Sequence, residues 1–221
     1  MPDNDAPAEA PERVAAFDVD GTITRRDCVI PFVRRIKGAP RLGARLLRHP
    51  IGLVRATLAR DRDTLKAAGV MASFEDEYVD RVEVAGVAFA RDIMRTNLRD
   101  DVIATLTAHL ADGDTVVLVS ASFEVYLRPL AAHLGVDHVL GTRLMDDGEG
   151  RLTGRLDGPN CRGPEKLRRL HDWLDVHAGG RDSVHLTVYG DSSGDRELLM
   201  DADAPQWVGK RDMPPSWVAE K

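Results

Sequence analysis

Two aspartates separated by one residue are the first candidates for chemistry in this chain. They are Asp18 and Asp20 in "FDVDGTIT", which follows the short apolar run "RVAAF". Because alternate residues of a strand point to the same side, the two carboxylates should lie together at the end of a strand. Two unit charges about 4 Å apart repel by roughly 4 kcal/mol at an effective dielectric of 20. The pair therefore predicts a cation between the carboxylates, or a proton held by one of them.

Two later segments also place polar side chains directly after apolar, strand-like runs. Ser120 and Ser122 follow "TVVLV", and Asp191 and Asp195 follow "VHLTVYG". In open parallel α/β sheets, ligand sites form just beyond the carboxyl ends of the strands. We therefore expect three separate segments to deliver acids and hydroxyls to one rim.

The residue types at this rim suit phosphoryl transfer. Asp18 and Asp191, with the backbone carbonyl of Asp20, offer the oxygens that Mg²⁺ prefers. Asp18 is the candidate nucleophile, which would form an aspartyl-phosphate, and Asp20 is the candidate general acid and base. Ser120 is a candidate donor to a phosphate oxygen. Lys166, in "GPEKLRRL", is a candidate cation that neutralises the phosphoryl group and holds Asp18 ionised.

The elements that must position these residues alternate between strands and helices, which indicates a parallel, Rossmann-like α/β sheet. About 70 residues with a mainly helical pattern follow the first strand, too many for one crossover, and we interpret them as an inserted cap. The expected organisation is a disordered tail over 1–12, a core domain over 13–24 and 99–221, and a helical cap over 25–98. Within it we expect strands over 13–17, 115–120, 136–141, 184–191 and 206–209, helices over 75–98, 101–111, 124–134, 165–177 and 194–200, and a hairpin over 143–158.

The composition fits a soluble cytoplasmic protein. Hydrophobic residues make up 43% of the chain and charged residues 30%, and no apolar run approaches the roughly 18 residues of a membrane span. Two cysteines, Cys28 and Cys161, do not indicate a disulfide framework.

One basic segment stands out from the net charge of −6. Residues 34–62 hold nine Lys or Arg and one acid, and residues 39–62 have an amphipathic helical pattern. The segment is either a solvated helical face or a platform for an anionic membrane surface or a phosphate-rich substrate. A single basic segment in an acidic chain does not favour general nucleic-acid binding.

Four motifs, "FDVDGTIT", "VSAS", "GPEK" and "GDSSGDRELL", resemble in this order those of the haloacid dehalogenase (HAD) superfamily, over about residues 13–208. The insert after the first motif resembles the C1 cap of the phosphoserine-phosphatase-like branch (HAD-IB). "NCRGPEKLRRL" and "YGDSSGDRELL" resemble phosphatidylglycerophosphatase C and its bacterial relatives. The resemblance implies Mg²⁺, a nucleophile at Asp18 and a cap that gates the site. It also implies metal binding by Asp18, Asp20, Asp191 and Asp195, and phosphate binding by Thr22, Ser120, Ala121 and Ser122.

Three positions keep alternative roles. Asp27 stands where phosphoserine phosphatases have a glutamate that reads the substrate amine, and it also fits the N-cap of a helix. Arg162 precedes Lys166 by one helical turn and competes for its role at the phosphoryl group. Asp195 either coordinates the metal through water or caps the helix that follows.

The predicted function is Mg²⁺-dependent hydrolysis of a small phosphorylated metabolite. One alternative is a phospholipid headgroup substrate such as phosphatidylglycerophosphate. A second is phosphoryl transfer to an acceptor other than water. A third, without catalysis, is a module that binds an anionic membrane surface.

Overall fold

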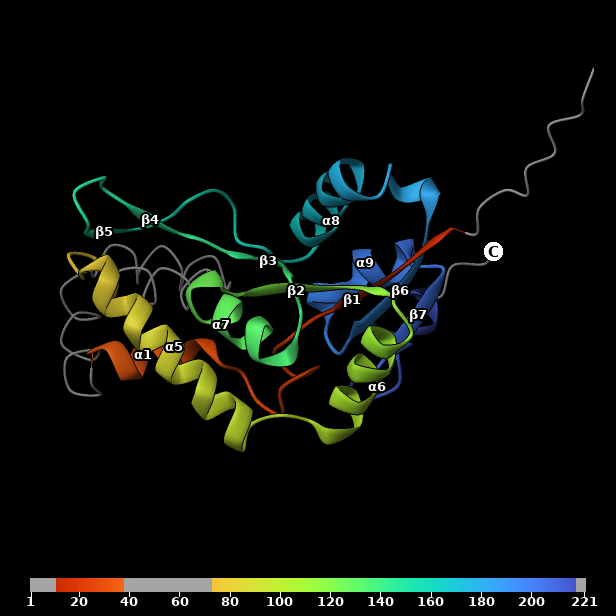
Figure 1. Cartoon of the computed structure of the whole chain (residues 1–221), viewed down its shortest axis with the longest axis horizontal. Helices are drawn as coiled ribbons and strands as arrows, with labels where there is room; N and C mark the ends of the chain where they lie inside the picture. The colour runs from red at the N-terminus through yellow and green to blue at the C-terminus, as the bar shows by residue number, and fades with distance from the viewer. Residues whose placement is uncertain (1–10, 38–72, 218–221) are drawn as a thin grey trace, which may run out of the picture.

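A five-stranded parallel sheet forms the centre of the protein (Figure 1). The structure is a computed structural model, and it describes residues 11–37 and 73–217. The strand order is β3-β2-β1-β6-β7, with β1 (Glu12–Phe17), β2 (Thr115–Phe123), β3 (His138–Thr142), β6 (Val184–Gly190) and β7 (Ala204–Trp207). β1 begins at Glu12, one residue before the predicted start of the core. The flanked parallel sheet confirms the predicted Rossmann-like fold class.

Helices cover both faces of the sheet, which explains why its strands read as continuous apolar runs. In β1, Ala15 and Phe17 belong to one apolar cluster, and Val14 and Ala16 belong to the other. Helices α6 (Asp100–Ala111) and α7 (Glu124–Leu134) cover the Phe17 face. Helices α8 (Pro164–His177) and α9 (Arg196–Asp201) cover the opposite face. Short 3₁₀ turns complete the core: η1 (Arg181–Ser183), η2 (Ser193–Asp195) and η3 (Pro215–Trp217).

The predicted cap begins and ends at one place on the core. Thr24 and Leu98 form an isolated antiparallel bridge, and the amide of Arg25 donates to the carbonyl of Asn97 at 2.7 Å. The outgoing and returning chains therefore run side by side here. Between them lie α1 (Val29–Lys37) and α5 (Val79–Thr96), on the α7 side of the molecule (Figure 1).

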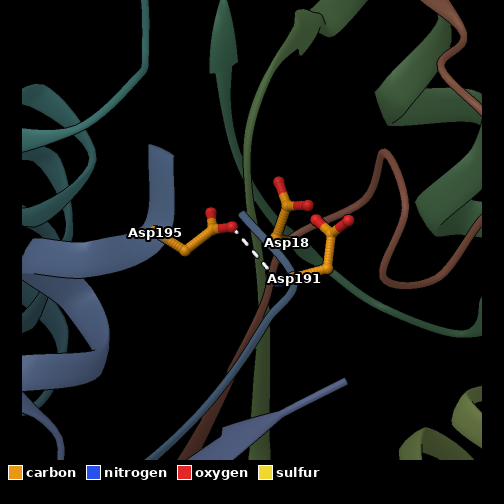
Figure 2. A group of neighbouring side chains, drawn as sticks. All are labelled: Asp18, Asp191 and Asp195. Carbon is orange, nitrogen blue, oxygen red and sulfur yellow. Dashed lines mark hydrogen bonds between the residues drawn. The ribbon is translucent and has the colours of Figure 1, made fainter. Parts of the chain in front are cut away.

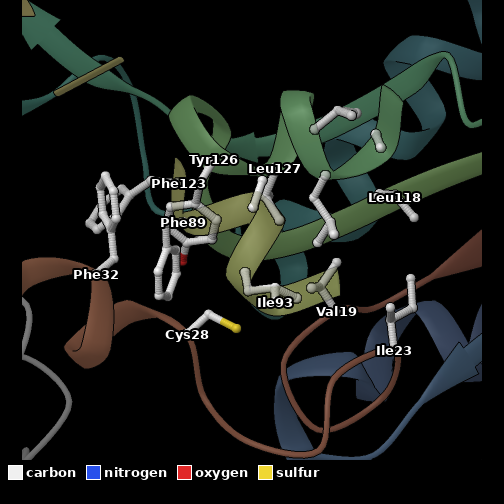
Figure 3. Packing of buried hydrophobic residues seen from close by; sticks show 14 of the residues in the cluster. Val19, Ile23, Cys28, Phe32, Phe89, Ile93, Leu118, Phe123, Tyr126 and Leu127 are labelled. Carbon is white, nitrogen blue, oxygen red and sulfur yellow. The ribbon is translucent and has the colours of Figure 1, made fainter. Parts of the chain in front are cut away.

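Aromatic side chains join these helices to the core. Phe32 of α1 and Phe89 of α5 pack on Tyr126 of α7, with ring centroids 4.8 and 5.3 Å away (Figure 3). Gly86 allows the close approach of α5, since a Cβ there would lie 2.3 Å from the carbonyl oxygen of Val125. One apolar cluster thus extends from the sheet into α1 and α5.

The predicted hairpin is present as β4 (Leu144–Asp146) and β5 (Leu152–Leu156), which pair antiparallel. Residues 38–72 and 1–10 lie outside the described residues, and with them most of the basic segment 34–62 and the helical interpretation of 39–62. Across the described ranges, none of the helices combines the length and apolar character that a membrane crossing requires.

Candidate active site

The carboxyl edge of the sheet borders a cavity of about 1660 Å³. Its lining includes residues that follow β1 and β6, residues in the last part of β2, and residues at the start of α8. Phe17, the last residue of β1, pairs with Leu118 of β2 and with Tyr189 of β6, so β1 and β6 end at the same level while β2 continues to Phe123. The register therefore brings Asp18, Ser120 and Asp191 to one rim, at the position that the sequence indicated.

Lys166 forms two short ion pairs beneath this cavity. Its Nζ donates to Oδ1 of Asp18 at 2.5 Å and to Oδ1 of Asp195 at 2.6 Å. All three side chains are at most 7% exposed. Helix α8 begins at Pro164, where proline already has the backbone angle that a first helical turn needs, and this places Lys166 at the rim. Arg162, the competing cation, lines the cavity but is exposed.

Burial shifts the pKa values of both Asp18 and Lys166. It raises the pKa of Asp18 to about 7; the nearby Lys166 opposes this rise, and Asp195 adds to it. Burial alone would lower the pKa of Lys166, but the two carboxylates outweigh it and raise that pKa above its usual range. Lys166 therefore stays charged across the physiological range, and Asp18 depends on it to remain ionised.

Asp195 holds the turn that follows β6. Its Oδ2 accepts from the amide and the hydroxyl of Ser192, at 3.1 and 3.0 Å, and from the amide of Asp191 at 3.3 Å (Figure 2). Ser192 and Asp195 form a capping box. Both oxygens of Asp195 thus have protein partners, and they lie in the turn before α9 and at Lys166. Asp195 stands at the N-cap position of α9 but makes no side-chain cap hydrogen bond to it, so the expected cap of the following helix is not formed.

Asp18, Asp191 and Asp195 form a group whose carboxylate oxygens lie within 4.8 Å of one another. Oδ1 of Asp191 is buried and has no hydrogen-bond partner among the described residues. Burial and then Asp195 raise the pKa of Asp191 to about 6, against the influence of Lys166. An orphaned carboxylate oxygen beside a second buried carboxylate fits a hard divalent cation such as Mg²⁺.

Gly21 allows Asp191 to approach the loop after β1. Its φ is +92°, and a Cβ at this position would lie 2.2 Å from Oδ2 of Asp191. Any other residue would be strained here and would also displace the carboxylate. The glycine of the "DGT" motif is therefore needed for the packing of the two acidic segments.

Asp20 is held by a hydrogen-bond chain from inside the protein. Ser122 Oγ donates to Oδ2 of Asp20 at 2.6 Å, and the hydroxyl of Tyr126 donates to Ser122 Oγ at 2.7 Å. The amide of Cys28 donates to Oδ1 of Asp20 at 3.0 Å. Burial raises the pKa of Asp20, while Ser122 works against that rise.

The predicted phosphate-binding residues separate into two groups. Ser120 and Ala121 line the cavity, whereas Ser122 and Thr22 are fully buried and lie outside its lining. Ser122 therefore lies behind Asp20 and donates to its carboxylate, whereas the sequence predicted that Ser122 would bind phosphate. The alternation of side chains along a strand predicts that Ser120 and Ser122 share a face. It does not predict that Asp20 occupies the space beside Ser122.

Asp27 lines the cavity and is exposed. Its Oδ1 accepts from the amide of Ile30 at 3.3 Å, in the first turn of α1. This contact is the N-cap contact that the sequence offered as one of two roles.

Sequence reasoning missed Tyr126, Arg99 and the segment 208–217. The hydroxyl of Tyr126 lies in the interior and gives no pattern at the sequence level. Arg99 Nη1 donates to the carbonyls of Gly21 and Val208, at 3.2 and 2.8 Å. The segment 208–217 follows the last parallel strand, whose carboxyl end faces the same rim, and this order along the chain was the available signal.

Comparisons with known proteins agree with this geometry. The family model described as haloacid dehalogenase-like hydrolase matches residues 15–200. Protein CicA of Caulobacter vibrioides is 37% identical over 190 residues, which are 86% of this chain and 83% of that protein.

Solved structures share the fold. A Bordetella pertussis Tohama I protein of unknown function is 25% identical, with a TM-score of 0.71 and coverage of 86% of both chains. A substrate-bound phosphoserine phosphatase is 17% identical, with a TM-score of 0.60 over 92% of this chain and 96% of that one. The chain therefore belongs to the haloacid dehalogenase-like hydrolases, with the fold of the phosphoserine phosphatases, as its four motifs predicted.

Proposed function

We propose that this protein is a Mg²⁺-dependent phosphatase that hydrolyses a small phosphomonoester through an aspartyl-phosphate at Asp18. The observation that carries the proposal is the buried pair of Asp18 and Lys166 at the floor of an open cavity. Nucleophilic phosphoryl transfer needs an ionised carboxylate that attacks phosphorus and a second acid that transfers protons. Lys166 keeps Asp18 ionised, and Asp20 is held nearby by its own hydrogen bonds. The fold shared with a phosphoserine phosphatase supports the same reaction class.

The acidic group fits the metal that this chemistry needs. Asp18 and Asp191 would hold Mg²⁺ with the carbonyl of Asp20, and Asp195 would keep the Asp191 turn in place. When bound, Mg²⁺ supplies charge neutralisation at the phosphoryl oxygens. Without a metal ion, three carboxylates, those of Asp18, Asp191 and Asp195, would lie close together. Within the described residues, Lys166 would be the one buried cation beside them.

In the first step, Asp18 attacks phosphorus with Oδ2, since Lys166 occupies Oδ1. The bond from phosphorus to the leaving oxygen breaks as the bond to Asp18 forms. Asp20 gives its proton to the leaving oxygen, and the raised pKa that burial gives Asp20 favours this acid role. From the floor of the cavity, Ser120 donates a hydrogen bond to a phosphoryl oxygen, and Lys166 neutralises phosphoryl charge.

In the second step, Asp20 acts as a base. It takes a proton from water, and the water oxygen attacks the phosphorus of the aspartyl-phosphate. The carboxylate of Asp18 leaves and returns to Lys166, and inorganic phosphate is released. One residue thus serves both half-reactions, which requires a fixed position, and the contacts from Ser122 and Cys28 provide it.

Hydrolysis of p-nitrophenyl phosphate tests the proposal directly. We expect phosphate release that requires Mg²⁺, falls to background when EDTA removes the metal, and returns when Mg²⁺ is added in excess. The physical reason is that the carboxylate group repels an anionic phosphoryl group unless a cation neutralises it. The same assay with a panel of phosphorylated metabolites checks whether the cavity rejects this generic substrate. Activity that persists unchanged in EDTA would contradict the metal role.

Ser122→Ala separates a positioning role from phosphate binding. Removing the donor to Asp20 should raise the pKa of Asp20 and loosen its position. We expect kcat to fall about tenfold with KM nearly unchanged, and the alkaline limb of the pH profile of kcat to move upward. Ser120→Ala is the matched comparison, because Ser120 lines the cavity and its loss should raise KM. A rise in KM alone for Ser122→Ala would show that Ser122 binds phosphate after all.

A further inference from the structure

The segment that follows β7, residues 208–217, forms part of the cavity wall. It contributes seven lining residues: Val208, Gly209, Lys210, Arg211, Asp212, Pro214 and Trp217. The lining thus takes more residues from this segment than from the loop after β1 or from the turn after β6. This stretch is therefore placed to contact a molecule that fills the cavity.

The start of the segment is fixed to the two acidic loops. The amide of Val208 donates to the carbonyl of Gly190 at 3.0 Å, and Arg99 joins the carbonyl of Val208 to that of Gly21. Gly209 lies so close to the site that a Cβ there would be 2.8 Å from the carbonyl oxygen of Asp191. Lys210 and Arg211 therefore come one and two residues after a point of contact with the candidate metal ligand.

Two tryptophans fix the remainder of the segment. Trp207 and Trp217 meet edge to face, with ring centroids 5.8 Å apart, and both line the cavity. The indole of Trp207 donates to the carbonyl of Arg211. The backbone that carries the two cations is therefore held at both ends, which reduces the entropy lost when they bind a ligand.

The charge of the wall favours an anion. Apart from the catalytic and metal-binding candidates, which are Asp18, Asp20, Lys166, Asp191 and Asp195, the lining holds six cationic and four acidic side chains. The cations are Arg25, Arg26, Arg99, Arg162, Lys210 and Arg211, and the acids are Asp27, Asp100, Asp101 and Asp212. Arg25 pairs with Asp100 at 2.9 Å, and Arg99 pairs with Asp101 at 2.8 Å.

Three of the remaining cations have no ion-pair partner within residues 11–37 and 73–217: Arg26, Lys210 and Arg211. The backbone of Arg26 is also fixed, since its carbonyl accepts from Thr24 Oγ1 at 2.9 Å and from Asn97 Nδ2 at 3.1 Å. In the proposed reaction, Lys166 and a bound metal ion would neutralise the phosphoryl group. Arg26, Lys210 and Arg211 are not needed for the phosphoryl group, and the backbone that carries them is held in place. They therefore favour a substrate with a second negative charge.

We propose that Lys210 and Arg211, with Arg26, select phosphomonoesters whose leaving group carries a second anionic group, a carboxylate or a further phosphate. The inference rests on the proposed phosphatase function and names the substrate class of the same site. Asp27 and Asp212 reduce the charge of the wall without reversing its sign, so neutral leaving groups bind more weakly than anionic ones.

Two esters that differ only in this charge test the inference: 4-carboxyphenyl phosphate and its neutral amide analogue, 4-carbamoylphenyl phosphate. We expect wild type to prefer the carboxylate ester by about tenfold or more in kcat/KM, the effect of one charge-assisted hydrogen bond. In the double variant Lys210→Gln/Arg211→Gln, this ratio should fall towards one. The matched control is Arg91→Gln/Arg95→Gln, which removes two exposed cations of α5 outside the cavity lining and should keep the wild-type ratio.

Binding to Asp18→Asn separates this inference from the proposed function. Tryptophan fluorescence, with Trp207 and Trp217 at the cavity, gives the Kd of each ester without turnover. A Kd ratio of tenfold or more that the wall variant removes supports the inference, even if wild type hydrolyses neither ester and the phosphatase proposal fails. A carboxylate-to-amide ratio within twofold of one, or a ratio that the wall variant leaves unchanged, overturns the inference while hydrolysis itself stands. A second phosphate in place of the carboxylate, with 1,4-phenylene bisphosphate as the probe, should also bind more tightly than the amide ester, and a Kd equal to that of the amide would count against the inference.

Discussion

Asp18→Asn is expected to reduce phosphate release by on the order of 10⁴-fold or more, because it removes the atom that attacks phosphorus. The amide retains the size of the side chain, and Lys166 keeps its ion pair with Asp195. The fold should therefore survive, with a thermal unfolding midpoint close to that of wild type. The measurement is kcat with p-nitrophenyl phosphate in Mg²⁺, beside a melting curve of the same preparation.

Trapping the intermediate gives this prediction a second readout. Wild type quenched in acid during turnover should contain a peptide with Asp18 that is heavier by one phosphoryl group, and Asp18→Asn should not. Asp20→Asn should slow both half-reactions and still accept some phosphoryl group at Asp18, because its nucleophile is intact. Phosphate release by Asp18→Asn within tenfold of wild type would remove Asp18 as the nucleophile.

Much of this site followed from the ends of strands. The run "RVAAF" predicted β1, and β1 ends at Phe17, one residue before Asp18. The run before Asp191 predicted β6, which ends at Gly190. The run before Ser120 predicted β2, which continues through Ser120 to Phe123. A parallel sheet has one carboxyl edge, so local patterns were sufficient to bring these three segments together.

Contacts between segments were beyond the sequence patterns. Asp20 accepts from Ser122, which lies 102 positions further along the chain. Gly21, directly after Asp20, has a φ of +92° that the sequence pattern does not specify. Tyr126 reaches that serine from the interior of α7. The choice between Ser120 and Ser122 as phosphate ligand depends on these distances, and a two-residue alternation is identical for both.

Lys166 and Arg162 illustrate the same limit. Both are cations near the start of α8, and their spacing alone leaves their roles exchangeable. Burial distinguishes them, because Lys166 is 2% exposed between two carboxylates while Arg162 is exposed at the cavity. Which face of a first helical turn is covered depends on how α8 packs on the sheet, which is a tertiary property.

Lys166→Met is expected to abolish activity and to lower the free energy of unfolding by about 3–5 kcal/mol at pH 8. The variant removes the shared cation of two buried carboxylates, and methionine fills most of the same volume. Asp18 and Asp195 would then be buried without a counter-charge. Chemical denaturation of wild type and variant, in the absence of metal, measures the difference.

The pH dependence of this loss has a definite sign. Asp18 in wild type already has its pKa raised to about 7 from an ordinary 3.8, and removal of Lys166 raises it further. A carboxyl whose folded pKa is raised stabilises the fold below its unfolded pKa, and this contribution is lost as the pH rises through the folded value. The destabilisation by Lys166→Met should therefore be smaller at pH 5, where the carboxyl binds a proton, than at pH 8.

Arg162→Met is the matched control, one helical turn earlier on the same rim. An exposed cation contributes about 1 kcal/mol or less, so this variant should unfold close to wild type at both pH values. A loss of equal size at pH 5 and pH 8 in Lys166→Met would mean that packing, not charge, accounts for its effect. If Arg162→Met also shows the larger loss at pH 8, the two cations share the role that we give to Lys166. A loss of unfolding free energy that occurs only in Lys166→Met, and is smaller at pH 5, would link stability and catalysis to one buried charge. The reason is that the lysine that keeps Asp18 ionised for attack also offsets the cost of burying that carboxylate.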